Sequence, residues 1–334
     1  MRYRSQTLGL SLIEVMISMA IGSIVILGVL NLFTANSETY NALQAQARLQ
    51  ESANYGLNVI GRDLQKAGYR GCYSSGDLYL TMTNVPSRFD LRTPLSVFNG
   101  VTGDDWSTSA TSLASSVSDV ATRGSDILSI RYLADDESYL SSALSDDTQA
   151  FEVIVVSGAS SSLASGDIAL LHDCEKATLF SVTNDPVPSG ARLRLEHAVD
   201  ASNSQANQVA GLAETGAFGT DAAVSSIVEN TYYVSQGASG LSGAGGLSLY
   251  RFDGSNSVEL VEGVENMQIK LGIDSDSDGV PNQYVDPSSG VDTTNVVAVW
   301  VALTSNSVAA VGTSETDGLL RRTYRQTIQL RNAR

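Results

Sequence analysis

The chain has 334 residues, of which 43% are hydrophobic and 17% are charged, and this composition is typical of a folded protein rather than of a disordered one. Lys and Arg number 20 against 36 Asp and Glu, so the formal net charge of -16 repels nucleic-acid backbones and argues against a general DNA or RNA binder. Two His and two Cys are too few for zinc clusters, Cys-ligated iron–sulfur sites or a dense disulfide scaffold, and they leave little material for an enzyme that uses a His base.

The amino terminus predicts a single membrane span. Arg2 and Arg4 precede a stretch, residues 15–37, that contains no charged residue. A helix of about 20 residues, rising ~1.5 Å per residue, crosses a bilayer core. The positive-inside rule places the short basic end in the cytoplasm and the bulk of the chain outside. A secretory signal peptide is the alternative, but the nearest Ala-x-Ala site, residues 45–47, lies far beyond the apolar stretch, and Glu14 interrupts its start.

Residues 9–14, Gly-Leu-Ser-Leu-Ile-Glu, resemble the prepilin motif of type IV pilins and type II secretion pseudopilins. The resemblance implies that a prepilin peptidase in the inner membrane cuts between Gly9 and Leu10, that the new amino terminus is methylated, and that residues 1–9 are a leader. Glu14 is then the fifth residue of the mature protein, as the motif requires. Leu10 stands where the family usually has Phe.

The position of Glu14 suggests a role in assembly. A charged carboxylate in the hydrocarbon core costs about 2.5 to 3.5 kcal/mol. The cationic amino terminus of a neighbouring processed subunit can neutralise it, whereas uncleaved protein cannot offer that amine at the same depth. The hypothesis is that Glu14 pairs with the processed amino terminus of an adjacent pilin.

Helical periodicity continues after the apolar stretch. Apolar residues recur at three- and four-residue spacing through Leu57, Ile60 and Leu64. We therefore expect one helix with a transmembrane half, residues 10–33, and an amphipathic half, residues 34–68. A membrane anchor followed by a coiled coil is the alternative, but no sustained heptad repeat supports it.

The remaining residues, 69–334, predict a β-rich exported domain. Short alternating or β-branched segments bounded by Gly, Ser, Asp or Asn are expected to form strands of an antiparallel sheet. These segments are residues 126–132, 151–156, 167–171, 191–195, 231–234, 247–252, 267–271, 296–302 and 324–330. Ser/Ala/Gly-rich stretches at 107–118, 157–165, 201–223 and 235–248 are expected to be surface loops. The expected fold class is α+β, type IV pilin-like, with a long amino-terminal helix packed on an antiparallel sheet.

Several segments resemble the PilW family of minor type IV pilins. They are residues 62–64, 67–69, 71–72, 166–167, 173–174, Phe180, 249–251, 260–265, 272–284 and 330–332. The resemblance implies a non-enzymatic minor pilin that helps to initiate pilus assembly and forms part of the tip complex, in support of twitching motility, adhesion or DNA uptake. The implied partners are other minor pilins, the major pilin, a tip adhesin and the prepilin peptidase, and nucleic acid is not expected. The implied location is a single pass in the inner membrane with a periplasmic head, followed by the pilus fibre or its tip.

Two alternatives remain open. A type II secretion pseudopilin shares the same structural plan. A membrane-anchored calcium-dependent adhesin belongs to a different class, and it predicts no cleavage at Gly9.

Cys72 and Cys174 are expected to form a disulfide, because the domain that carries them faces an oxidising compartment. The bond would tie the end of the stalk helix to the sheet. The alternative is a reactive thiol beside His172, which requires a free cysteine in that compartment.

An acidic segment after residue 273 resembles a calcium-binding loop, in which alternate carboxylates wrap a hard cation and a Gly permits the sharp turn. The candidate ligands are Asp274, Asp276, Asp278, Val280 through its carbonyl, Asn282 and Asp286. The twelfth position, where the EF-hand pattern has a bidentate Glu, is Val285, and the nearest acid is one place later. Calcium and an acidic solvated turn are both compatible with this segment, and no organic cofactor is expected.

The carboxyl end is basic. Arg321, Arg322, Arg325, Arg331 and Arg334 lie in or next to the last expected strand. Charged residues are typical of an edge strand because they block edge-to-edge pairing. We therefore expect the last strand to lie at the edge of its sheet, and binding of DNA during uptake is the alternative role of these arginines.

Overall fold

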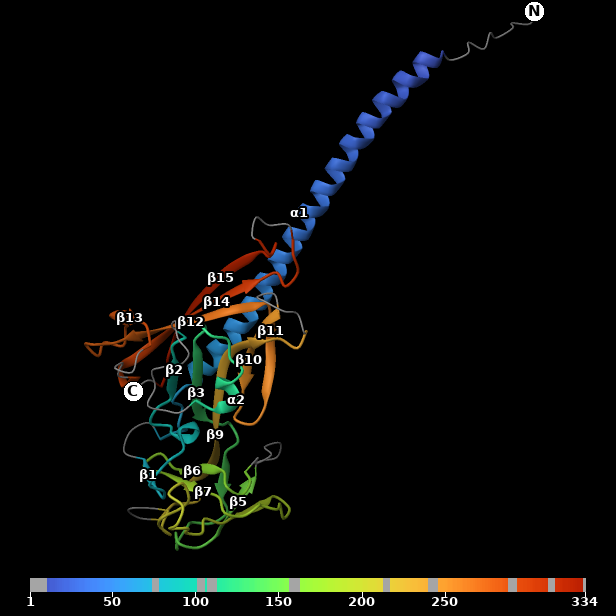
Figure 1. Cartoon of the computed structure of the whole chain (residues 1–334). Helices are drawn as coiled ribbons and strands as arrows, with labels where there is room; N and C mark the ends of the chain where they lie inside the picture. The colour runs from blue at the N-terminus through green and yellow to red at the C-terminus, as the bar shows by residue number, and fades with distance from the viewer. Residues whose placement is uncertain are drawn as a thin grey trace, which may run out of the picture.

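The computed structural model describes residues 11–73, 78–100, 106, 113–155, 163–212, 217–239, 246–287, 293–311 and 316–332. One long helix projects from a head built almost entirely of strands (Figure 1). The pilin-like α+β fold expected from the sequence is confirmed. The leader, Gly9 and Leu10 lie outside the described residues.

The helix, α1 (Leu12–Lys66), has two different halves. Its most apolar window of 18 residues has a mean hydropathy of 2.4, and no part of this window is buried. Among the described residues, α1 is the one helix that is long and apolar enough to cross a membrane. In the second half, Ala53, Leu57, Ile60 and Leu64 are buried at three- and four-residue spacing. The two halves therefore correspond to an unpartnered apolar segment and an amphipathic segment packed on the head.

Two sheets flank the second half of α1. The larger sheet contains β1 (Tyr79–Leu80), β2 (Leu95–Phe98), β3 (Ile127–Leu133), β4 (Ser138–Leu140), β5 (Phe151–Val155), β6 (Ile168–His172), β7 (Ala177–Ser181), β8 (Arg192–Leu195), β9 (Ala223–Gln236), β10 (Leu247–Phe252) and β11 (Ser257–Glu262). The smaller sheet has the order β13 (Gln283–Val285), β12 (Val264–Ile273), β14 (Val296–Asn306) and β15 (Arg321–Gln329). Short helices occur at η1 (Ser87–Phe89), α2 (Ser115–Ser118) and η3 (Thr293–Asn295). All strand pairings are antiparallel except that of β1 with β7.

Gly56 lies where α1 packs closely against both sheets. A Cβ atom at this position would lie 3.1 Å from Leu249 of β10 and 3.2 Å from Leu303 of β14. The absence of a side chain therefore lets the helix approach both sheets at once.

The strand β9 joins two parts of the head. Its first residues pair with β4 and β6, and its later residues pair with β3 and β10. One core surrounds α1, and a second core contains Phe151, Phe180 and Phe218. The strands of this second core lie at the end of the head that is farthest from the amino terminus (Figure 1).

The sequence-based prediction missed part of the sheet. Residues 231–234 lie in the second half of a strand of 14 residues, and β1, β2, β4, β7, β11 and β13 were not expected. Polar residues between Ser225 and Asn230 of β9 interrupt the apolar pattern that would indicate a strand. Ser225 and Asn230 are buried there because each has a polar partner inside the head. The last four residues of the expected loop at 107–118 form α2.

Candidate functional site

The beginning of α1 is a capping box. The backbone N–H of Glu14 donates to the Ser11 hydroxyl oxygen at 3.3 Å, and the backbone N–H of Ser11 donates to the Glu14 carboxylate at 3.2 Å. The Ser-x-x-Glu spacing of residues 11–14 is the sequence signal for this motif, and the sequence-based prediction did not use it. Glu14 is exposed, so its carboxylate stays accessible one turn into the helix.

A polar cluster fastens the second half of α1 to the larger sheet. The carboxylate of Asp63 accepts hydrogen bonds from the Tyr132 hydroxyl at 3.1 Å, the Asn230 amide at 2.6 Å and the Tyr232 hydroxyl at 2.6 Å. Burial, and then the charge of Asp63, raise the pKa of both tyrosines above the ordinary value. Both hydroxyls therefore stay protonated and keep donating to Asp63.

A buried ion pair lies on the opposite face of β3 and β9 from this cluster. The Arg131 side chain is 2% exposed, and its guanidinium lies 2.7 Å from the Glu229 carboxylate across β3 and β9. Arg131 also donates to the Thr93 carbonyl at 2.8 Å and to the Ser96 hydroxyl at 2.9 Å. The Glu229 carboxylate therefore compensates the buried charge, and two neutral oxygens accept further hydrogen bonds from the guanidinium.

Cys72 and Cys174 form the expected disulfide, with Cα atoms 4.8 Å apart and a sequence separation of 102. The bond joins the segment after α1 to the turn between β6 and β7. The reactive-thiol alternative is wrong for this structure because both sulfurs are bonded. Burial lowers the pKa of the neighbouring His172, which favours its neutral form.

The acidic segment forms a compact loop between β12 and β13. Asp274, Asp276 and Asp278 each place a carboxylate oxygen within 4.8 Å of the others. Asp274 is buried, and it accepts hydrogen bonds from the backbone N–H groups of Ser277 and Gly279 at 2.7 and 2.8 Å. These three carboxylates can therefore offer oxygen ligands to one hard cation.

The other candidate ligands lie elsewhere in the same segment. The side-chain oxygen of Asn282 accepts two hydrogen bonds from Ser275, at 2.6 and 2.9 Å. Asp286 does not join the three neighbouring aspartates. The pairing of β13 with β12 places it beside Lys270, with which it forms an ion pair at 2.8 Å. The role of the Val280 carbonyl as a ligand stays a prediction.

The fold and this set of features define a pilin-like protein. Two family models match the chain: the "Prokaryotic N-terminal methylation motif" matches residues 4–30, and "Type IV Pilus-assembly protein W" matches residues 231–318. The second match extends from β9 through β14 and includes the acidic loop. No match is found among curated proteins or among solved structures.

The second match confirms the resemblance to the PilW family over residues 231–318, and the two matches together support a type IV pilus-associated pilin. Proteins of these families are structural components of pili, which agrees with the expectation of a non-enzymatic protein.

Proposed function

We propose that the chain is a minor type IV pilin that helps to initiate pilus assembly and forms part of the tip complex. The observation that carries this proposal is the combination of a methylation motif with an apolar helix whose first half has no partner among the described residues. An unburied apolar helix needs lipid before assembly and neighbouring helices after it. Its partners are other minor pilins, the major pilin and a tip adhesin.

The proposed topology follows from the charges around the span. Before assembly, the short basic end lies in the cytoplasm and the head lies in the periplasm. The far end of the head, formed by β4 to β8, lies outside the region matched by the PilW model. The candidate activities of the pilus are twitching, adhesion and DNA uptake.

The processing step is tested by the intact mass of the protein from its native membrane, with and without the prepilin peptidase. We expect loss of residues 1–9 and addition of one methyl group only when the peptidase is present. An unprocessed amino terminus in the presence of the peptidase would contradict the pilin mechanism and favour the anchored adhesin. A processed protein that fractionates with a secretion apparatus rather than with pili would favour the pseudopilin.

Glu14→Ala is expected to leave membrane insertion and cleavage intact and to lower incorporation into pili about tenfold, the effect of losing ~1.4 kcal/mol of pairing with a neighbouring amine. Ser11→Ala is the matched control, because it removes the capping partner and keeps the carboxylate. Immunoblots of sheared pili against whole membranes give the incorporated fraction. Equal incorporation of Glu14→Ala and the unaltered chain would contradict the pairing.

We propose calcium as the occupant of the acidic loop, supported by the close approach of Asp274, Asp276 and Asp278. A cation that binds only the folded state stabilises it by about 2.7 kcal/mol at a hundredfold excess over Kd. Adding calcium to chelator-treated protein is therefore expected to raise the Tm, and Asp276→Asn combined with Asp278→Asn is expected to abolish this rise. Glu175→Gln, at an exposed acid outside the loop, is the control. A Tm that does not respond to calcium would leave the acidic solvated turn as the correct interpretation.

A further inference from the structure

The strand β15 is a long, regular and unpaired edge. In the described part of the chain it pairs with β14 alone, through nine consecutive residue pairs without a register shift. The prediction that the last strand lies at a sheet edge is therefore confirmed. A regular edge presents a row of backbone donors and acceptors on which another strand can form.

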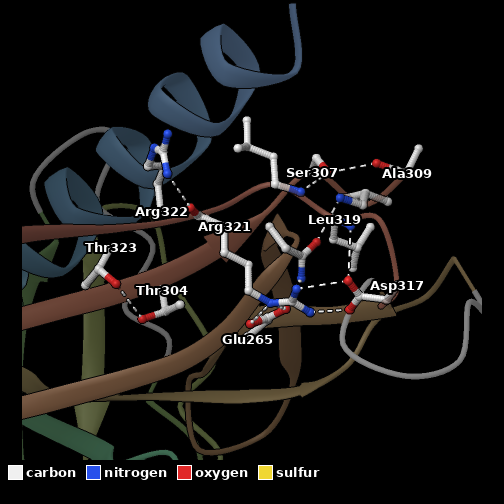
Figure 2. A network of polar contacts seen from close by, with 12 residues as sticks. Glu265, Thr304, Ser307, Ala309, Asp317, Leu319, Arg321, Arg322 and Thr323 are labelled. Atoms are coloured by element: carbon white, nitrogen blue, oxygen red, sulfur yellow. Dashed lines mark hydrogen bonds and ion pairs between the residues drawn. The ribbon is translucent and has the colours of Figure 1, made fainter. Parts of the chain in front are cut away.

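The pairing with β14 identifies the groups on the free side. The Leu330 N–H donates to the Val297 carbonyl at 2.9 Å, so this pair is a hydrogen-bonded one. Antiparallel pairs alternate, so the backbone groups of the odd-numbered residues 321–329 point away from β14. Figure 2 shows a direct consequence: the Arg322 side chain donates to the outward carbonyl of Arg321 at 3.2 Å.

A groove lies beside this edge. It has a volume of about 530 Å³ and is lined by Gln65 of α1 and by residues 326–331. Gln65 and Gln326 give it polar walls, and the buried side chain of Ile328 lies under it. An added strand would therefore have one row of side chains against α1 and the other row facing solvent.

The edge carries uncompensated positive charge. Arg322, Arg325 and Arg331 are exposed, and among the described residues no carboxylate lies within ion-pair distance of them. Arg321 differs, because it is held by Glu265 at 2.8 Å and by Asp317 (Figure 2). In a chain of net charge -16, this strip favours an acidic partner and opposes pairing with the same edge of a second copy.

We propose that β15 accepts an extended acidic segment of another protein as an additional strand of the smaller sheet. The backbone groups of Thr323, Arg325, Thr327 and Gln329 would supply the hydrogen bonds. Carboxylates on one face of the incoming segment would pair with Arg325 and Arg331, which share the face of β15 opposite the buried Ile328. Binding of this segment requires neither cleavage of the leader nor an assembled pilus. Absence of binding would therefore not contradict the proposed function.

The test uses the full chain in detergent and a labelled nine-residue peptide that alternates Glu with Thr and Val. Binding is expected to weaken at least tenfold when Arg325→Glu is introduced, and to weaken as the salt concentration rises. Arg192→Glu, at an exposed arginine on β8, is the control. Absence of binding by the acidic peptide, or equal binding by a version with Lys in place of Glu, would overturn the proposal.

A second measurement separates strand addition from charge attraction. Thr327→Pro removes an N–H that points away from β14, whereas Thr327→Ala keeps it. We expect Thr327→Pro to bind the peptide at least tenfold more weakly than Thr327→Ala. In the unaltered chain, the peptide is expected to slow hydrogen exchange at Thr323, Arg325 and Thr327. Protection confined to another part of the chain would overturn the proposal even if Thr327→Pro failed to fold.

Discussion

Asp63→Ala is expected to lower the free energy of unfolding of the head by about 3 kcal/mol, because buried donors left without an acceptor cost ~1–3 kcal/mol each. Tyr132, Asn230 and Tyr232 all donate to Asp63, and all three are buried. Alanine offers none of them an acceptor. The same change also releases the last turns of α1 from the larger sheet, so the loss is expected to reach the junction between stalk and head.

Two further variants isolate this effect. Asp63→Asn keeps one side-chain oxygen, so it is expected to lose less stability than Asp63→Ala. Glu51→Ala removes a carboxylate from an exposed position on the same helix and is expected to change stability by less than about 0.5 kcal/mol. Denaturant unfolding of the full chain in detergent, followed by tyrosine fluorescence, gives the three values. A loss below about 1 kcal/mol for Asp63→Ala would show that water replaces the carboxylate.

The sequence was sufficient to predict the helix because its signals are local. An uncharged stretch and then a three- and four-residue apolar repeat predict the two halves of α1 within one segment. The partners of Asp63 are 69, 167 and 169 residues away in sequence. No local pattern can indicate such contacts, because they depend on how β3 and β9 pair in the folded head.

The same distinction applies to the acidic loop. Asp274, Asp276 and Asp278 come together because they are neighbours in one turn. Asp286 lies only eight residues beyond Asp278 in the sequence, yet it leaves the group because β13 folds back on β12. The register of that short hairpin decides the ligand set, and the sequence-based prediction did not include β13.

Arg131→Met is expected to destabilise the head by about 3–5 kcal/mol, the cost of removing one partner from a buried ion pair. Glu229 would remain largely buried beside an apolar side chain, and Thr93 and Ser96 would lose a donor. Replacing both charges, Arg131→Met with Glu229→Met, is expected to recover much of the loss because no unpaired charge is left inside.

The chain contains a matched surface control for this experiment. Arg192 and Glu152 also pair across neighbouring strands, at 2.9 Å, but their side chains are 59% and 46% exposed. Arg192→Met is expected to cost less than about 1 kcal/mol, because water replaces the lost partner. Denaturant unfolding of the unaltered chain, the two single variants and the double variant separates the energetic effect of burial from that of pairing. If Arg131→Met and Arg192→Met lost equal stability, the interior position of the Arg131 pair would have no energetic consequence. Water would then have to reach Glu229 in the Arg131→Met variant.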